Sequence, residues 1–252
     1  NFLCMIRPDK HFTQEEARLL DLCLVCHAEH GGGNNSTFTC RSVSSTGTDT
    51  YSAIAAAVGS LKGPKHGGAN RQVLAQFSLI KQTVRDWKDD DAVADCVGRI
   101  LRRELGDGSG LIYGMGHAVY TLSDPRTVIL RQSARTLAAQ RGMLDELELM
   151  EAVERVTPRV FAEVTGHEKV MCANVDMYSG LIYQMLDIPP DLFTPLFAVA
   201  RITGWCAHRM EEVLTGGRLY RPAYKSLTRH REYIPMAART YRKNPLPAEK
   251  RD

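Results

Sequence analysis

Apolar residues recur every three or four positions over most of the chain, which predicts α-helices rather than strands. Thr13 and Glu16 form a capping box that begins one helix, and the glycines at 31–33 end it. The other helices predicted by the pattern are 50–61, 69–84, 91–105, 125–140, 144–164, 176–186 and 193–214. The polar, basic tail from 218 onward is expected to be extended. The predicted fold class is therefore mainly α.

Composition narrows the class of protein without identifying it. The 252 residues are 44% hydrophobic and 24% charged, enough for one large domain or two smaller ones. A net charge of +3 suits an enzyme with anionic ligands but is too small to indicate nucleic-acid binding. No run of about 18 apolar residues indicates a membrane span. The start of the chain has neither an initiator Met nor a signal-peptide pattern, so we expect a fragment of a cytoplasmic protein.

The first chemical cluster contains Cys23, Cys26, His27 and His30. It includes a C-x-x-C-H string, as in haem attachment, and four potential zinc ligands. Both cysteines also continue the apolar stripe of a helix, where thiols commonly serve as small core groups. The two histidines share one helix face near its carboxyl end, where the helix dipole stabilises them with or without a ligand. Haem or zinc binding is thus an alternative that physical chemistry disfavours.

His66 lies between Gly63-Pro64 and Gly67-Gly68, immediately before a predicted helix. The positive end of that helix would lower the pKa of the imidazole and favour its neutral form. A neutral imidazole is a good hydrogen-bond donor to a developing oxyanion. The alternative interpretation is an ordinary turn.

His117 follows Gly114 and Gly116 and precedes Arg126 by nine positions. A dinucleotide-binding loop is a weak interpretation, because no strand precedes the glycines and the third glycine is missing. The histidine and the arginine flank a tight turn and are suited to clamp a carboxylate and its adjacent carbonyl.

Three further charged residues have both structural and functional interpretations. Asp176 precedes an apolar helix, as an N-cap residue does. Arg201 lies inside a very apolar helix, so it needs an anionic partner from the protein or from a ligand. Arg221, in the tail, is by itself an ordinary solvated charge.

Taken together and in order, these strings resemble citrate synthase. They are HAEHGGGNNSTF, SLKGPKHGGAN, GMGHAVY with DPR, NVDMYSG, FAVARITGW and the step from Arg221 to Pro222. The resemblance implies that Asp176 is the general base that removes a methyl proton from the acyl-CoA thioester. His66 would stabilise the enolate, and His117 would polarise the oxaloacetate carbonyl. The implied oxaloacetate-binding residues are His27 (supporting), His30, Arg126, Arg201 and Arg221.

The same resemblance implies the substrates and the assembly. Acetyl-CoA and oxaloacetate would give citrate and CoA after thioester hydrolysis, with no permanent cofactor and no metal. Arg221 would be donated across a homodimer, and neither nucleic acid nor membrane is an expected partner. The residues expected to contact CoA, mainly through their backbone, are Leu111, Ile112, Tyr113, Gly114, Met115 and Gly116.

The family fold implies a large helical domain from residues 1–68 and 181–252, and a small one from 69–180. Family members are longer at the N-terminus, so we expect a truncated chain whose own activity the sequence leaves open. A dimerising scaffold without activity is a further alternative. Thr121 replaces a basic residue that contacts CoA phosphate in some members, and Lys65 is a candidate substitute. A 2-methylcitrate synthase using propionyl-CoA remains open, because one methyl group is worth only about 1–3 kcal/mol in a pocket.

Overall fold

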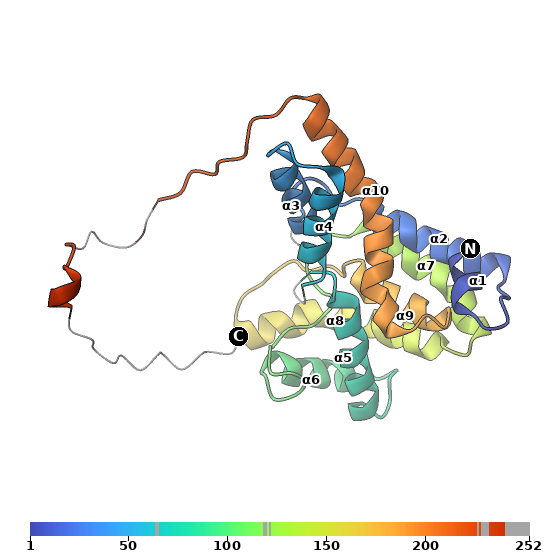
Figure 1. Ribbon diagram of the computed structural model, residues 1–252. Helices are drawn as coiled ribbons and strands as arrows, with labels where there is room; N and C mark the ends of the chain where they lie inside the picture. The colour runs from blue at the N-terminus through green and yellow to red at the C-terminus, as the bar shows by residue number, and fades with distance from the viewer. Residues whose placement is uncertain (64–65, 118–119, 121, 226, 228–231, 240–252) are drawn as a thin grey trace. The chain divides into compact units, whose positions relative to one another are not determined.

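The computed structural model describes residues 1–63, 66–117, 120, 122–225, 227 and 232–239. These residues form α1 (Phe2–Ile6), α2 (Gln14–Ala28), α3 (Asn35–Ser44), α4 (Thr50–Leu61), α5 (Ala69–Thr83), α6 (Asp90–Leu101), α7 (Pro125–Gln140), α8 (Leu144–Thr165), α9 (Asp176–Met185), α10 (Phe193–Leu214) and the 3₁₀ turns η1 (Pro190–Leu192) and η2 (Met236–Ala238) (Figure 1). Within them no strand forms, and the one isolated antiparallel bridge joins Met115 to Ala173. The mainly α prediction is confirmed.

Side-chain caps begin the helices where the sequence predicts them. The Thr13 hydroxyl accepts the Glu16 amide at 3.1 Å, and the Glu16 carboxylate accepts the Thr13 amide at 2.7 Å. Both halves of the predicted capping box therefore form. At α7, the Asp124 carboxylate accepts the amide of Arg126 at 3.0 Å and Pro125 occupies the first turn. This cap fixes Arg126 at the start of α7.

Helix α3 was not predicted from the sequence. Its residues are rich in Asn, Ser and Thr, whose side chains compete for backbone hydrogen bonds and disfavour helix interiors. The Thr39 hydroxyl indeed donates to the Asn35 carbonyl at 2.8 Å. Tertiary packing overrides this preference, because Cys40 is fully buried in a cluster with Trp205 of α10. Local propensity was therefore a poor guide here.

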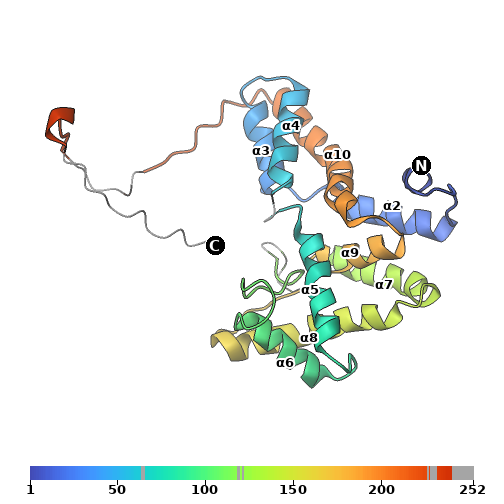
Figure 2. The ribbon, with the colours of Figure 1, turned by 60° about the horizontal axis from the view of Figure 1, so that its bottom comes forward.

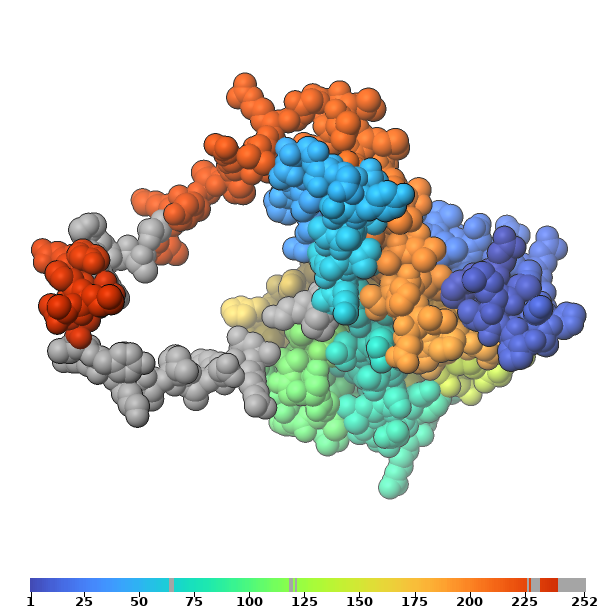
Figure 3. Space-filling view, in the orientation of Figure 1, coloured from blue at the N-terminus to red at the C-terminus, as the bar shows by residue number. Residues whose placement is uncertain are grey.

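Two hydrophobic clusters hold the helices together. The larger one is built mainly from α2 and α5 to α9, and its centre includes Ile80, Val97, Leu147 and Leu181. The smaller one joins α3 and α4 to α10 through Cys40, Ala53, Ala57, Leu61, Phe197 and Trp205. In Figure 2, α5, α6, α8 and α9 lie together near one end of α10. Helices α3 and α4 lie along its other end. In the space-filling view α4 lies directly against α10 (Figure 3).

The chain divides into two compact units, 1–219 and 220–252. All helices from α1 to α10 belong to the first unit, and η2 belongs to the second. The inserted small domain at 69–180 remains a prediction. Among the helices of the described residues, none has both the length and the apolar character needed to cross a bilayer.

Candidate active site

His30 and His117 meet although 87 positions separate them in the sequence. Their Nε2 atoms are 3.0 Å apart and their rings stack in parallel, with centroids 5.0 Å apart. Arg126 joins them, with its Nη2 atom 3.3 Å from Nε2 of His117. The buried Asp124 carboxylate accepts from Arg126 Nε at 3.0 Å and from Nη2 at 2.7 Å. Three of the predicted oxaloacetate residues therefore form one polar cluster at the start of α7.

Hydrogen bonding determines which His117 nitrogen carries the proton. The Tyr120 amide donates to His117 Nδ1 at 3.0 Å, so the neutral ring has its proton on Nε2. Burial lowers the pKa of both His117 and His30, and each is lowered further by the positive charge of Arg126. Both rings are therefore neutral at pH 7, with the Nε2–H of His117 directed to His30.

Arg201 is a buried cation whose charge is only partly compensated. Its side chain is fully buried, its Nε donates to the His27 carbonyl at 2.6 Å, and its guanidinium lies 4.8 Å above the Phe197 ring. Neither Nη1 nor Nη2 finds a hydrogen-bond partner in the described part of the chain. Burial lowers the pKa of Arg201 to about 10. Two unpaired donors on a buried cation suit a carboxylate ligand.

His66 is held by a serine that was not among the predicted site residues. Its Nε2 lies 3.1 Å from the Ser36 hydroxyl, which also accepts from Trp205 Nε1 at 3.2 Å. Burial, together with the charges of Arg201 and His30, lowers the pKa of His66 to about 4. The neutral imidazole that was predicted is thus present. However, burial is its main cause rather than the helix dipole. Ser36 lies within the HAEHGGGNNSTF string, so that string held the signal for it.

Asp176 is the first residue of α9 and is partly exposed. Its amide donates to Asn174 Oδ1 at 3.1 Å, so the capping role of the helix start passes to Asn174. Burial raises the pKa of Asp176 to about 6, against the opposing effect of Arg126 and Arg201. A carboxylate with this pKa is a stronger base than an exposed one while still ionised at neutral pH.

His27 is fully buried and faces the protein interior. Its Nδ1 donates to the Cys23 carbonyl at 2.7 Å, and its ring packs edge-on against Phe197. Burial lowers the pKa of His27 to about 4, so it is neutral. Its backbone carbonyl is the acceptor for Arg201, and through it His27 contacts the candidate site.

The haem or zinc alternative finds no support in this geometry. Cys23 and Cys26 both lie in the hydrophobic core, and burial raises the pKa of each thiol. His30 points to His117 instead of toward the cysteines. In the described residues no three His, Cys, Asp or Glu side chains gather as a metal site would require.

The loop predicted to contact CoA is fixed by a side chain of α5. Gln76 donates to the Leu111 carbonyl at 2.8 Å and accepts the Tyr113 amide at 3.0 Å. The loop is also paired with the segment before α9, because Gly116 donates to the Cys172 carbonyl at 2.8 Å. Gly114 has a φ of +85°, and a Cβ there would lie 2.7 Å from the sulfur of Met177. Gln76 is a second residue that the sequence analysis missed.

The structure does not test three of the predicted residues. Lys65 and Thr121 lie outside the described residues. Arg221 is exposed in the second unit, so its role across a dimer stays a prediction.

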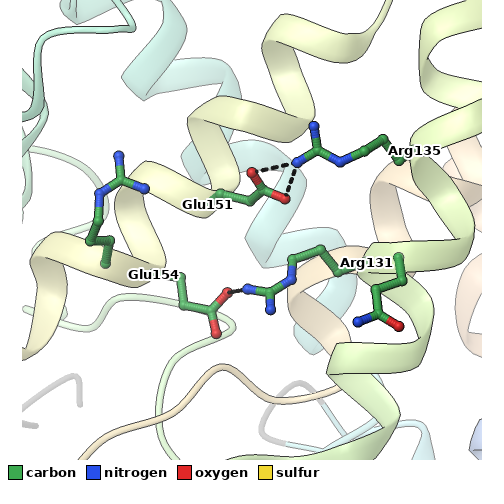
Figure 4. Close-up of a pocket in the computed structure, with 6 residues that line it drawn as sticks. Arg131, Arg135, Glu151 and Glu154 are labelled. Atoms are coloured by element: carbon green, nitrogen blue, oxygen red, sulfur yellow. Dashed lines mark hydrogen bonds and ion pairs between the residues drawn. The ribbon is translucent and has the colours of Figure 1, made fainter.

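A cavity of about 480 Å³ between α7 and α8 lies elsewhere and holds its own ion pairs (Figure 4). There Arg135 bonds Glu151 at 2.7 Å and Arg131 bonds Glu154 at 3.2 Å. The third arginine of the lining, Arg155, bonds Asp90 at 2.6 Å, so every arginine here already has a carboxylate partner and this cavity does not indicate an anion site.

Comparison with known proteins identifies the family. The family model described as the C-terminal domain of citrate synthase matches residues 1–223. The chain belongs to the citrate synthase family. It is 41% identical to the citrate synthase of Synechocystis sp. over 242 residues, which are 95% of this chain and 55% of the relative. It is 37% identical to 2-methylcitrate synthase 1 of Corynebacterium glutamicum over 246 residues, 95% of this chain and 58% of that protein.

Solved citrate synthase structures share the fold. The citrate synthase of Thermoplasma acidophilum, solved as a ternary complex with carboxymethyl coenzyme A and oxaloacetate, matches with a TM-score of 0.72 and 31% identity. The match covers 90% of this chain and 56% of that one. The chain therefore spans about half the length of the citrate synthases it matches.

Proposed function

We propose that the protein carries the catalytic half of an enzyme that condenses an acyl-CoA thioester with oxaloacetate. The observation that carries this proposal is the buried Arg201 guanidinium, whose two Nη atoms have no partner among the described residues. A carboxylate beside it would relieve the cost of an uncompensated buried charge. The neutral His30 and His117 and the cationic Arg126 supply donors for the remaining oxygens of an oxo-dicarboxylate.

In the proposed reaction, Asp176 removes a proton from the methyl carbon of acetyl-CoA. The electron pair of that C–H bond forms the C=C bond of an enolate, the π pair of the thioester carbonyl moves to its oxygen, and His66 stabilises that oxygen by a hydrogen bond. To donate it, His66 carries its proton on Nδ1, and the Ser36 hydroxyl, which donates to Asn34 Oδ1 at 2.8 Å in the structure, turns to donate to Nε2 of His66. As the thioester C=O re-forms, the enolate carbon attacks the oxaloacetate carbonyl carbon, whose oxygen takes the Nε2 proton of His117, and water replaces that proton. Water hydrolyses the resulting citryl-CoA to citrate and CoA.

The backbone of the loop at 111–116 is the proposed contact for the adenine of CoA. Gln76 supports this assignment, because its hydrogen bonds to Leu111 and Tyr113 attach the loop to α5. A 2-methylcitrate synthase that takes propionyl-CoA is the second candidate, supported by relatives of that name at 36% and 37% identity. Turnover of acetyl-CoA and propionyl-CoA, compared on the full-length protein, distinguishes the two.

The proposed working form is a cytoplasmic homodimer to which each subunit contributes Arg221 for its partner's site. The seven unpaired cysteines support a reducing compartment. Arg221→Ala should lose oxaloacetate binding. Mixing it with subunits that lack Arg201 instead should restore binding, which would support the exchange of Arg221 between subunits.

The proposed general base is tested by Asp176→Asn in the full-length protein. We expect condensation to fall by at least about a thousandfold, because the amide cannot accept the proton. Oxaloacetate binding should stay within about twofold, since Arg201, His30 and Arg126 are unchanged. Asp191→Asn is the matched control, because Asp191 is a largely exposed carboxylate in η1, the 3₁₀ turn before α10. Normal turnover in Asp176→Asn would rule out the assigned base.

A further inference from the structure

One face of α10 is shaped to hold the carboxyl end of α2. Arg201, Gly204 and His208 follow at spacings of three and four residues, so they share this face. Arg201 donates to the His27 carbonyl at 2.6 Å, and His208 Nε2 donates to the Glu29 carboxylate at 3.0 Å. α10 thus bonds the last turn of α2 and the residue that follows it, directly before His30.

The Glu29 carboxylate binds the backbone of that turn. Its Oε1 atom accepts the amide of His30 at 2.9 Å, the amide of Gly31, and Nε2 of His208. Both amides directly follow the end of α2, where an extended Glu29 terminates the helix. One oxygen therefore fixes the backbone of the residue whose ring meets His117.

Gly204 provides the space for this arrangement. A Cβ at that position would overlap the Oε2 atom of Glu29 and the Ala28 carbonyl. Glu29 packs against the α10 backbone at Gly204, where no side chain intervenes. The donors Arg201 and His208 lie on either side of that position. The other groups that face His208 are Arg41, at 3.5 Å from Nδ1, and Glu211, at 3.6 Å.

We propose that Glu29 and His208 are positioning residues that hold His30 against His117 and so preform the oxaloacetate site. This inference rests on the proposed function only for the identity of the ligand, since the contacts position His30 whatever it binds. Neither residue is placed to touch the reacting atoms. They act through the backbone of His30, and their loss should affect one substrate selectively.

The test compares His208→Leu with His208→Gln in the full-length protein. Glutamine presents an N–H close to the position of Nε2 and should keep the bond to Glu29, whereas leucine cannot donate. We expect His208→Leu to raise the KM for oxaloacetate by about tenfold, as expected for a lost hydrogen bond to a charged group. The KM for acyl-CoA should change by less than about twofold. Glu211→Gln is the control, because it alters the charge beside His208 without contacting Glu29.

A second readout does not depend on activity. The His30 ring signals, assigned in the nuclear magnetic resonance spectrum with His30→Gln, are titrated with pH. In His208→Leu the midpoint for His30 should rise toward that of an exposed histidine, while His208→Gln and Glu211→Gln should match the parent protein.

The possible outcomes separate this inference from the proposed function. A parent protein without condensation activity would refute the proposed function, and the His30 titration alone would then decide the positioning role. An unchanged titration and an unchanged KM for oxaloacetate in His208→Leu would overturn the inference. The inference would also be overturned if His208→Leu and His208→Gln raised the KM for oxaloacetate and for acyl-CoA equally. Such a result would indicate a general loss of structure.

Discussion

Replacing Arg201 by methionine separates its cost to the fold from its value to ligand binding. In the folded chain the pKa of Arg201 falls from 12.5 to about 10, chiefly because of burial. The charged form of Arg201 is therefore less stable in the folded chain than in the unfolded chain by about 3 kcal/mol. The sign follows from linkage: a base whose pKa is lowered on folding destabilises the fold at every pH where it stays protonated in the unfolded chain.

Methionine removes this cost but also removes a hydrogen bond. The bond from Nε to the His27 carbonyl is 2.6 Å long and has a charged donor, so it contributes about 1.5–3 kcal/mol. The two effects oppose each other. We therefore expect the free energy of unfolding of Arg201→Met to lie within about 2 kcal/mol of the parent value.

Ligand binding should respond much more strongly. A carboxylate that loses its partner in a buried ion pair loses about 3–5 kcal/mol, which is more than about a hundredfold in Kd. Thermal denaturation with and without oxaloacetate measures both quantities. At a concentration of about one hundred times Kd, oxaloacetate should stabilise the parent protein by about 2.7 kcal/mol. Arg201→Met should show no such stabilisation at that concentration.

Arg209→Met is the matched control on the same helix. Arg209 donates to Thr50 at 3.0 Å, to Ser44 at 3.0 Å and to the Thr48 carbonyl at 2.7 Å, so all three of its nitrogens are bonded. Its replacement should destabilise the fold but preserve the response to oxaloacetate. Retention of that response in Arg201→Met would refute the reasoning, as would a greater loss of stability in Arg201→Met than in Arg209→Met.

Three further predictions follow from single contacts. Burial raises the pKa of Asp176 to about 6, so its charged form destabilises the fold above that pH. In urea denaturation, Asp176→Asn should therefore raise the free energy of unfolding by at most about 3 kcal/mol at pH 8 and leave it unchanged below pH 4. Gln76→Leu should raise the KM for acyl-CoA by about tenfold without changing that for oxaloacetate, because the loop at 111–116 loses both its bonds to α5; equal effects on both substrates would contradict this. Gly204→Ala should lower the free energy of unfolding by about 1–3 kcal/mol because its Cβ meets Glu29, whereas Gly59→Ala, in open space on α4, should raise it by about 0.4–1 kcal/mol; thermal denaturation of both variants distinguishes them.

Local signals in the sequence were reliable where the interaction they describe is itself local. The capping box of Thr13 and the cap at Asp124 join residues three or two positions apart, so their pattern is visible in the sequence. The same local reasoning failed for α3, because its stability comes from Cys40 packing against a helix that follows 150 or more residues later. Low helix propensity could not reveal that compensation.

The candidate site divides in the same way. The sequence alone determined that Arg201 needs an anion, because one arginine in so apolar a helix requires a partner. By resemblance it also determined the family, and it predicted the set of site residues. Only the tertiary structure decided that no protein carboxylate within the described residues bonds the Nη atoms of Arg201. It likewise decided that His30 meets His117.

The supporting contacts of Gln76, of Ser36 and of the pair Glu29 and His208 were found only in the structure, although Ser36 and Glu29 lie within the HAEHGGGNNSTF string. Each supports a site residue through a contact that spans from 30 to 179 positions of the chain. Helix periodicity and capping are fixed by neighbouring residues, whereas such contacts depend on how whole helices pack. The amino-acid pattern therefore determined most of the helices and the chemistry they carry, whereas packing determined α3 and which of these groups lie together.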